Sequence, residues 1–549
     1  MTPDQFTTPS LDYWLFAPVL VVLGVACVGI LVEAFVPRRA RFATQTGLAL
    51  AGLAASLGMT VWQWRKAAEL GVWVRPHAAG LVDPRPGTPV TGTIMADGPT
   101  HGWWAVLFGF TLIALIAFAE RRLHGGATAF TPSAAATPGS AAETEAAGAG
   151  VVHSEVFPLA LFSVGGMALI VAAQDLLVFF VGLEILSMPL YILAGLARQR
   201  RLVSQEAALK YFLLGGAASA IALFGIGCLF GYSGSFAYEQ LASAVTYGRG
   251  GDPLLLAGMA LVAVGLLFKI GAVPFHLWVP DVYQGAPTPV TAFMSVCTKV
   301  AAIAALMRLF YVGLGGMRWT WQPLLAGLAV VTIVVGAVIA ITQSDVKRVL
   351  AYSSVAHAGF VLVPVAGAAT LVSGTASGQV GSVASVTFYM IAYGLATIGA
   401  FTVVSLVQSQ GRESSGLDSW AGLGRRRPLV GALMVAFLLS LAGIPLTAGF
   451  VGKLAVFTAA WRGGYWWLVL IAVAGSLVAV YIYVRVLQVM FFRRAEAGAE
   501  PVDVARPGAA TWIVLAVCLL GTLGLAVVPG PLLDALQAAS SFLIPSLPG

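Results

Sequence analysis

The chain has 549 residues, of which 59% are hydrophobic and only 10% are charged, and its formal net charge is +7. Soluble domains carry about 25% charged residues, so this composition excludes an ordinary soluble enzyme. Apolar runs of roughly 20 residues are long enough to cross a bilayer. Fourteen such runs occur, at about 14–36, 44–64, 102–120, 156–173, 175–196, 207–230, 254–277, 287–311, 321–342, 347–367, 381–409, 428–461, 466–491 and 510–529.

This pattern predicts an all-α polytopic membrane protein with about fourteen transmembrane helices. No basic segment precedes the first run, which predicts a retained helix and not a cleaved signal peptide. Loops after odd-numbered runs hold seventeen Lys and Arg, whereas loops after even-numbered runs hold seven. Positively charged loops tend to stay on the cytoplasmic side, so both termini are predicted to lie outside. Topology then accounts for the positive charge, and no nucleic-acid partner is needed.

Cofactor motifs are missing from the sequence. Cys27, Cys228, Cys297 and Cys518 lie singly in apolar runs, without the paired spacing of iron–sulfur or zinc sites. No glycine-rich phosphate loop joins a strand to a helix. We therefore expect no bound cofactor and no metal on this chain.

The seventh and twelfth runs are each interrupted by a proline. Run seven contains "GAVPFH" with Pro274, and run twelve contains "GIPLTAGFVGK" with Pro445. Proline removes a helical hydrogen bond, and the freed carbonyl is tolerated at membrane depth only where protein or water covers it. An ordinary proline kink is the alternative for each break alone. Because the two breaks lie five spans apart, we predict two inverted five-helix repeats, spans 4–8 and 9–13, with broken helices 7 and 12 along an ion path.

Two polar segments interrupt the apolar pattern. Residues 65–101 are rich in Pro and Gly and are predicted to form an outside loop, whereas residues 124–152 are Ala/Gly/Thr-rich and are predicted to be a flexible inside linker. The expected organisation is three helices and the polar loop in 1–123, the linker in 124–152, a first repeat in 153–311, a second repeat in 312–495, and a C-terminal helix and tail in 496–549.

Five charged side chains and two histidines lie well inside the predicted spans. They are Glu184, Lys210, Lys269, Lys299 and Lys453, with His276 and His357. Each buried charge costs about 2.5–3.5 kcal/mol on insertion, so we expect this set to face a hydrated interior. A lysine removed from water can exchange its proton, whereas an arginine stays protonated. We predict a proton relay in which Glu184 pairs with Lys210 and separation of the pair favours release of the proton.

Some of these residues have simpler explanations. Lys210 lies near the inner end of its span, where it could snorkel to the surface or pair with Glu206 at i−4. His276 follows Lys269 by seven residues, two helical turns on one face, and with His357 it could relay protons between lysines. Either histidine could instead be a hydrogen-bonded structural residue. Haem ligation is disfavoured, because no histidine pair has the spacing i, i+13 or i+14 within one helix.

Four stretches carry a resemblance to a known family. They read "LEILSMPLYILAGL" (183–196), "ALKYFLLGGAASAIALFGIGCLFG" (208–231), "PFHLWVPDVYQGAPTPVTAFMSVCTK" (274–299) and "GIPLTAGFVGK" (443–453). Together they resemble the antiporter-like membrane subunits of proton-pumping NADH:quinone oxidoreductase, respiratory complex I, over about residues 155–495. Within that family the subunit N branch is the most similar, because subunit M usually has glutamate where this chain has Lys453.

The resemblance implies roles residue by residue. Glu184 matches the family's glutamate of the fifth helix, and Lys210 matches the lysine of the sixth. Lys269, Lys299 and Lys453 match the lysines of the broken seventh, the eighth and the broken twelfth helices.

The resemblance also implies a setting. We expect a proton-translocating membrane-arm subunit beside sibling antiporter-like subunits, in the lipid bilayer of a bacterial inner membrane, with periplasmic termini. NADH, FMN, iron–sulfur clusters and quinone are expected on partner subunits. A stand-alone or multisubunit cation/proton antiporter and a structural membrane-arm spacer are the alternatives.

Overall fold

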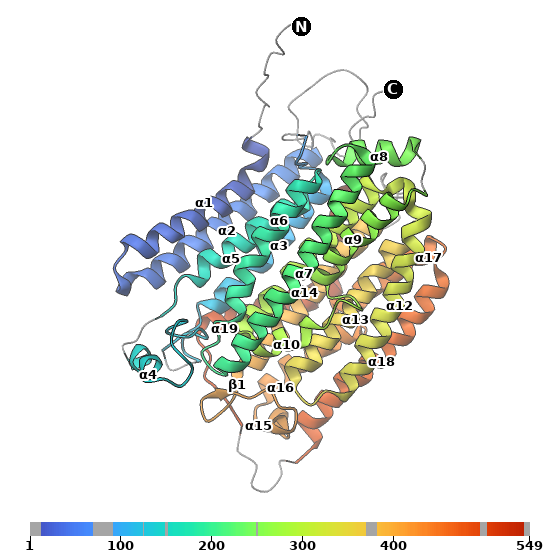
Figure 1. Cartoon of the computed structure of the whole chain (residues 1–549). Helices are drawn as coiled ribbons and strands as arrows, with labels where there is room; N and C mark the ends of the chain where they lie inside the picture. Colours follow the sequence, from blue (N-terminus) through green and yellow to red (C-terminus); the bar gives the residue numbers. More distant parts are fainter. Residues whose placement is uncertain are drawn as a thin grey trace.

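The computed structural model describes residues 13–69, 92–123, 126–148, 152–248, 251–368, 381–494 and 502–542, and these form a bundle of helices that lie side by side (Figure 1). The helices are α1 (Tyr13–Phe35), α2 (Arg38–Glu69), α3 (Gly98–Phe118), α4 (Ala141–Gly148), α5 (Val156–Ala172), α6 (Leu176–Ala194), α7 (Arg201–Ser233), α8 (Tyr238–Tyr247), α9 (Pro253–Ile270), α10 (Trp278–Gly285), α11 (Thr288–Arg308), α12 (Arg318–Thr342), α13 (Val346–Ala366), α14 (Ser382–Leu406), α15 (Leu423–Arg426), α16 (Pro428–Ala442), α17 (Ala448–Arg462), α18 (Trp466–Phe492), α19 (Ala509–Val527) and α20 (Gly530–Ala538). The strands are β1 (Val407–Ser409), β2 (Arg412–Glu413) and β3 (Asp503–Val504).

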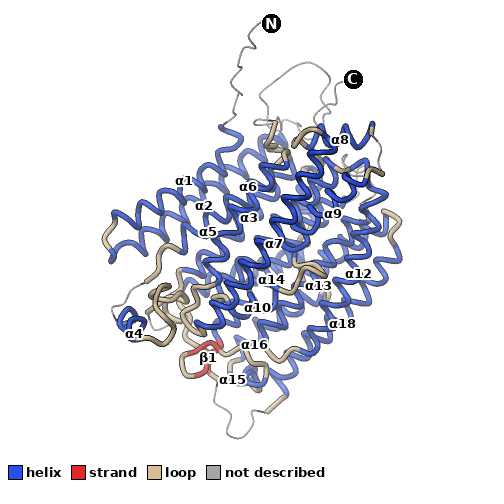
Figure 2. The backbone as a smooth tube through the Cα atoms, viewed as in Figure 1, coloured by secondary structure: helices blue, strands red, loops and turns tan. Residues whose placement is uncertain are grey.

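The predicted all-α membrane class is confirmed. Helix dominates the backbone in Figure 2, and twelve helices of the described residues are long and apolar enough to cross a membrane. Each of the fourteen expected runs coincides with a helix, but α5 and α16 are shorter than a full span, with 17 and 15 residues. The number fourteen therefore stays a prediction. The short helices α4, α8 and α20 were not expected, because apolar runs indicate only elements that cross the bilayer.

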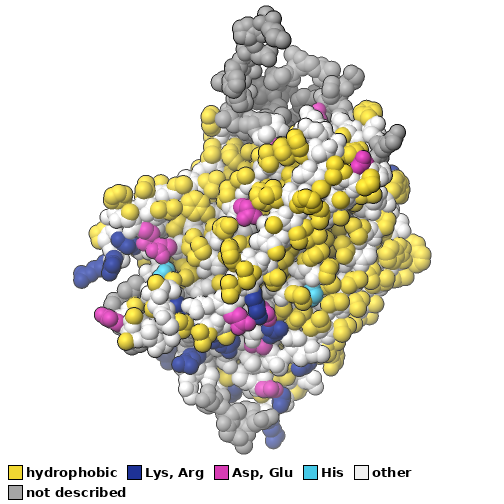
Figure 3. All heavy atoms as spheres, in the orientation of Figure 1, with side chains coloured by type: hydrophobic (Ala, Val, Ile, Leu, Met, Phe, Trp, Pro, Cys, Tyr) yellow, Lys and Arg dark blue, Asp and Glu magenta, His cyan; other side chains and the backbone are white. Residues whose placement is uncertain are grey.

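The surface of the bundle matches a lipid environment. In Figure 3 hydrophobic side chains cover the lateral face, and Lys and Arg gather toward the end that carries β1 and α15. We call this the β1 end and the opposite one the α8 end. Burial of apolar side chains against lipid replaces their burial in a protein core, so a helix can expose Leu209, Phe212 and Leu213 on one face, as α7 does.

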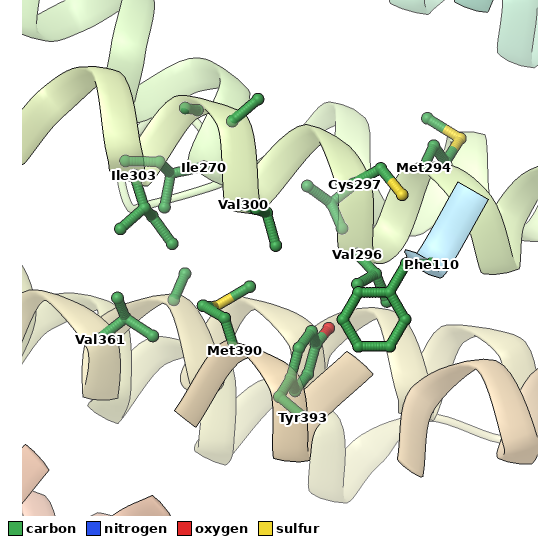
Figure 4. Packing of buried hydrophobic residues seen from close by; sticks show 14 of the residues in the cluster. Phe110, Ile270, Met294, Val296, Cys297, Val300, Ile303, Val361, Met390 and Tyr393 are labelled. Carbon is green, nitrogen blue, oxygen red and sulfur yellow. The ribbon is translucent and has the colours of Figure 1, made fainter. Parts of the chain in front are cut away.

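Three helices form the centre of the molecule. Nearly every residue of α11, α13 and α14 is buried inside the bundle. Figure 4 shows Val300 and Ile303 of α11 facing Val361 of α13 and Met390 of α14. Because these helices have protein on all sides, any polar side chain on them must find a partner inside the bundle.

The loops after odd-numbered spans meet at the β1 end. Strand β1 pairs antiparallel with β2, in the register Gln408↔Glu413, and with β3, in the register Gln408↔Asp503. Isolated bridges join Phe130 to Ala197 and Asp345 to Gly416 at the same end. The grouping of basic loops on one side therefore agrees with the structure. Which side faces the cytoplasm stays a prediction.

The two polar segments differ from expectation. Residues 70–91 lie outside the described residues, but Asp97, expected in a loop, is fully buried and caps α3 by accepting from Thr100 N at 3.0 Å. The segment 126–136, expected to be flexible, packs on the bundle, and Arg201 donates to the carbonyls of Ser133 and Ala136 at 3.1 Å each. These hydrogen bonds from Arg201 hold the segment in place against the bundle, which its composition does not indicate.

Both predicted helix breaks are present and are built alike. Gly271 follows the last residue of α9 and Gly443 follows the last residue of α16, each with φ +78°, a left-handed conformation that favours glycine. Pro274 and Pro445 then lie in the non-helical segments that lead to α10 and α17. The connections at Asp175 and Asp345, which would correspond in the two repeats, lie at opposite ends of the bundle. These features support the inverted repeat, which stays a prediction in its details.

Candidate functional site

Each helix break has a lysine against it. Lys299 of α11 places its Nζ 3.7 Å from the point where a Cβ on Gly271 would lie, and the Lys453 Cδ would be 2.6 Å from a Cβ on Gly443. Both lysines are almost completely buried, with 2% and 5% of their surface exposed. Glycine at both positions permits the left-handed turn, and it leaves room for the side chain of Val279 at Gly271 and for that of Lys453 at Gly443.

The two lysine ammonium groups are held by oxygen atoms. Lys299 Nζ donates to the carbonyl of Ser354 at 2.7 Å. Lys453 Nζ donates to the carbonyl of Ala442 at 2.6 Å and to the Ser476 hydroxyl at 2.7 Å. Ala442 is the last residue of α16, so the break supplies a carbonyl at the open end of a helix. No carboxylate is bonded to either ammonium group in the described part of the chain, so these contacts fix position without neutralising charge.

His357 lies between the two lysines. Its Nδ1 is 2.6 Å from the Tyr389 hydroxyl, and its Nε2 is 3.1 Å from the Tyr483 hydroxyl. The imidazole is within electrostatic reach of both Lys453 and Lys299. Because neutral imidazole can accept a proton on one nitrogen and donate from the other, this arrangement suits transfer along a hydroxyl–imidazole–hydroxyl row.

Hydroxyl groups extend the contacts of His357. The Tyr393 hydroxyl donates to Ser354 Oγ at 2.9 Å, on the residue whose carbonyl holds Lys299. The Tyr393 and His357 rings are 4.9 Å apart. Ser353 Oγ forms a short hydrogen bond with the Tyr483 hydroxyl. Polar groups of α13 and α14 therefore lie between Lys299 and His357, and Lys453 reaches the same helix α13 at Phe360, whose ring centre is 5.1 Å from its Nζ.

Lys269 occupies a different environment, an aromatic box. Its Nζ lies 5.2 Å from the ring centre of Tyr191 and 5.1 Å from that of Tyr211, within cation–π range. The Tyr191 hydroxyl, at 3.5 Å, is the nearest polar partner. Glu184 acts on Lys269 electrostatically without a direct bond, and its Oε1 is buried without a hydrogen-bond partner. The structure thus brings Glu184 and Lys269 into one cluster.

The predicted pairing of Glu184 with Lys210 is wrong in this structure. Lys210 Nζ instead contacts Glu206 at 2.7 Å and Asp281 at 2.8 Å. Helices α6 and α7 are antiparallel, and side chains lean toward the N-terminus of their own helix, so Glu184 and Lys210 lean toward opposite ends. The alternative pairing with Glu206 at i−4 is confirmed, and Lys210 is 43% exposed, as a side chain that reaches toward the surface should be.

The expected alignment of His276 with Lys269 is also wrong. Helix α9 ends at Ile270, so the seven residues between them are not two helical turns. The buried His276 ring has no hydrogen-bond partner of good geometry among the described residues, and its nearest ring contact is Tyr352 at 6.3 Å. Its role as a relay residue stays a prediction.

Sequence reasoning missed an ionic cluster at the β1 end. Asp281 of α10 accepts from Lys210 and also from Arg348 Nη1 of α13 at 2.8 Å. Lys347, the residue before Arg348, forms an ion pair with Glu413 at 2.9 Å. Burial raises the pKa of the Glu413 carboxyl, but Lys347, Thr288 and Arg200 together outweigh this effect and hold that pKa below its ordinary value. The signal that could have found this cluster is the carboxylate in "WVPD", seven residues after Pro274.

Lys347 and Glu413 of this cluster also line a pocket at the β1 end. Its walls include Arg198, Gln284, Thr288, Lys347 and Glu413. Thr288 donates a short hydrogen bond to Glu413. The pocket lies where α10 and α11 meet, below the Lys299 region of the central helices.

A second missed feature is a fully buried ion pair near the α8 end. Arg308 at the end of α11 donates two hydrogen bonds to the Asp97 carboxylate, at 2.6 and 3.0 Å, and one to the carbonyl of Val171 at 2.9 Å. Both side chains are 1% exposed or less. Asp97 lies in the segment predicted to be a loop, and Arg308 lies near the end of the run 287–311, so their contact could not be inferred from either position alone.

No group of three or more His, Cys, Asp or Glu side chains is placed to hold a metal ion in the described ranges. Cys27, Cys228, Cys297 and Cys518 are all free thiols. The site is therefore a set of titratable side chains and hydroxyl groups inside a helix bundle. Such a set can bind, hold and pass protons.

Known proteins share both the sequence and the fold. Residues 173–479 match the family model described as NADH:quinone oxidoreductase/Mrp antiporter, TM. The chain is 50% identical to NADH-quinone oxidoreductase subunit N of Cutibacterium acnes, over 97% of this chain and 96% of that protein, and 50% identical to subunit N of a Nocardioides species, over 98% and 100%.

Solved structures with the same fold include a chain of respiratory complex I. A chain of respiratory complex I from Thermus thermophilus is 30% identical, with a TM-score of 0.70 and coverage of 95% of this chain and 100% of that one. A chain of the Mrp complex from a Dietzia species shares the fold, with a TM-score of 0.73 at 21% identity, over 96% and 98%. The chain is thus a multi-pass membrane protein that belongs to the antiporter-like membrane subunits of NADH:quinone oxidoreductase, in the subunit N branch of that family.

Proposed function

We propose that this chain translocates protons as a membrane-arm subunit of an NADH:quinone oxidoreductase. The observation that carries the proposal is the row of buried groups along α13. Lys299 is bonded to the Ser354 carbonyl, His357 to the Tyr389 and Tyr483 hydroxyls, and the Lys453 ammonium group lies 5.1 Å from the ring centre of Phe360. The subunit N relatives and the complex I chain support the same assignment. No other chemistry is suggested by these side chains.

The row is suited to protons because lysine and histidine can exist in two charge states inside the membrane. Among the residues that the structure describes, no carboxylate is bonded to Lys299 or Lys453, so each ammonium group is sensitive to a charge that arrives nearby. A proton that reaches His357 between them repels a proton on either lysine. Movement of charge along the row follows from this repulsion together with the hydrogen bonds to Tyr389 and Tyr483.

We assign Glu184 and Lys269 to the other half of the relay. Lys269 lies close to the first break at Gly271, whose opposite wall is Lys299. A change in the charge of Glu184 therefore reaches Lys269 first and Lys299 next. This order replaces the Glu184–Lys210 pairing that the sequence suggested.

The outward face of α6 supports a place beside a sibling subunit. Glu184 lies in the middle of an exposed stripe of that helix, and a carboxylate facing lipid alone is costly. The stripe consists of Leu177, Val181, Met188 and Ile192 around the glutamate. We propose that a neighbouring membrane-arm subunit covers this stripe. NADH oxidation and quinone reduction, with FMN and iron–sulfur clusters, take place on partner subunits in this proposal, and the complex lies in the bacterial inner membrane with periplasmic termini.

Substitution of Lys299 tests the relay. Lys299→Ala in the intact complex, reconstituted in vesicles, is expected to lower the number of protons pumped per NADH oxidised, because the row loses its amine at the first break. Lys66→Ala, at the end of α2, is the matched control for loss of one lysine. NADH oxidation with a water-soluble acceptor and migration on a blue-native gel report assembly. Wild-type pumping by an assembled Lys299→Ala complex would refute the relay and leave the structural-spacer role.

A further inference from the structure

The ionic cluster at the β1 end is not used by the relay described above. Asp281 lies at its centre, on the short helix α10 that follows the first break. One carboxylate oxygen accepts from Lys210 of α7, and the other accepts from Arg348 of α13, each at 2.8 Å. A single carboxylate therefore joins the helix that carries the outermost lysine of the first repeat to a central helix of the second.

Among the described residues two carboxylates contact Lys210, and of these Asp281 is the one whose distance from Lys210 changes when helices move against each other. Glu206 is on α7 itself, one turn before Lys210, so it moves with the lysine, and it is 62% exposed. Asp281 is on a different element and is 32% exposed. Arg348 is further fixed by Gln343 and Gln284, whose side-chain oxygens accept from it at 3.1 Å each.

Helix α13 connects this cluster to the central row. Arg348 precedes Ser354, whose carbonyl holds Lys299, and His357 follows within the same helix. From Arg348 to His357 is about 14 Å along the helix axis. Every residue of this helix except Arg348 is buried, and Arg348 is 27% exposed, so a shift of α13 against its close-packed neighbours would carry Arg348 and His357 together.

We propose that Asp281 is a positioning residue for proton translocation, which holds Lys210 at the β1 end and ties that position to α13 through Arg348. The inference rests on the proposed function. When α13 shifts as the charge on Lys299 or His357 changes, Arg348 moves Asp281 relative to α7. Lys210 then either stays with Asp281 at the β1 end or is released toward the interior of the bundle.

A matched pair of substitutions tests the role of Asp281. Asp281→Asn in the intact complex removes the charge and keeps the shape, whereas Asp503→Asn removes a carboxylate from an arginine pair at the same end that does not contact a relay lysine. Half-exposed ion pairs shift an equilibrium by up to about fivefold. We expect Asp281→Asn to lower the rate of proton pumping by up to about fivefold at unchanged assembly, Asp281→Glu to restore most of it, and Asp503→Asn to have no effect.

The contact with Arg348 is tested by a double substitution. If Asp281 acts through Arg348, then Asp281→Asn with Arg348→Gln pumps no more slowly than Asp281→Asn alone, because the second change removes a contact that is already lost. Additive losses would overturn the link to α13. Glu206→Gln is expected to have less effect than Asp281→Asn, and the reverse order would overturn the choice of carboxylate.

Lys269→Ala, measured in the same vesicles, distinguishes a failure of the role of Asp281 from a failure of the relay. Reduced pumping in Lys269→Ala with wild-type pumping in Asp281→Asn would overturn the role of Asp281 and leave the relay standing. Wild-type pumping in assembled Lys269→Ala would instead count against the relay itself.

Discussion

Gly443→Ala should displace the Lys453 side chain at the second helix break without unfolding the protein. An alanine at φ +78° carries backbone strain of about 1–2 kcal/mol. Its Cβ would lie 2.6 Å from Lys453 Cδ and 3.1 Å from Lys453 Nζ. A lysine side chain is flexible, so the lysine and not the backbone gives way, and its hydrogen bonds to Ala442 and Ser476 are disturbed.

The size of the effect follows from those hydrogen bonds. A hydrogen bond to a charged group contributes about 1.5–3 kcal/mol. Loss of one of these hydrogen bonds lowers the ratio of the native to the displaced position of the Lys453 side chain by roughly ten- to a hundredfold, at 1.36 kcal/mol per factor of ten. Proton pumping per NADH oxidised should fall, while oxidation of NADH by a water-soluble acceptor stays unchanged.

Gly464→Ala is the control for strain alone. Gly464 has φ +86°, in the turn between α17 and α18, and a Cβ there would meet no atom within 4 Å. The two variants therefore share the backbone penalty and differ only in the clash with Lys453. Equal pumping by assembled Gly443→Ala and Gly464→Ala complexes, measured with a pH-sensitive dye in vesicles, would refute the claim that this glycine makes room for the lysine.

Two further predictions concern stability. Arg308→Met leaves Asp97 charged and buried, so it should destabilise the subunit by about 3–5 kcal/mol, against about 1 kcal/mol or less for Arg427→Gln in an exposed pair; thermal unfolding of the complex should rank them so, and the opposite ranking would contradict the structure. The pKa of Glu413 is held below its ordinary value, so its contribution is fully present above about pH 4.3, the unfolded value, and is lost as the pH falls through the lower folded value. Glu413→Gln should flatten the acid end of the stability profile, and an unchanged profile would show that the contribution is absent.

The sequence predicted correctly those features that depend on the residues of a single helix. Apolar runs located the helices, because a backbone in lipid must satisfy its own hydrogen bonds. Pro274 and Pro445 located the breaks, because proline cannot continue the hydrogen-bond ladder. The lysines of the central row could be selected from the sequence, because a charge inside an apolar run is costly and therefore rare in membrane helices unless it has a function.

Contacts between helices could not be inferred in the same way. Glu184 and Lys210 have opposite charges on neighbouring spans, yet antiparallel helices direct their side chains apart, and Asp281 is the partner of the lysine. The buried pair of Arg308 and Asp97 joins a span end to a segment that looked like a loop. Partners on different elements depend on helix direction and rotation, and neither is recorded in the residues themselves.

The sequence alone thus determined the membrane class, the positions of the breaks and the choice of Lys269, Lys299 and Lys453 as buried amines, since each follows from local hydrogen bonding and the cost of charge in lipid. Only the tertiary structure decided which groups meet. It placed Lys299 and Lys453 against the glycines of the two breaks, His357 between two tyrosines, and Asp281 between Lys210 and Arg348, because those contacts arise from the packing of helices that are far apart in the chain.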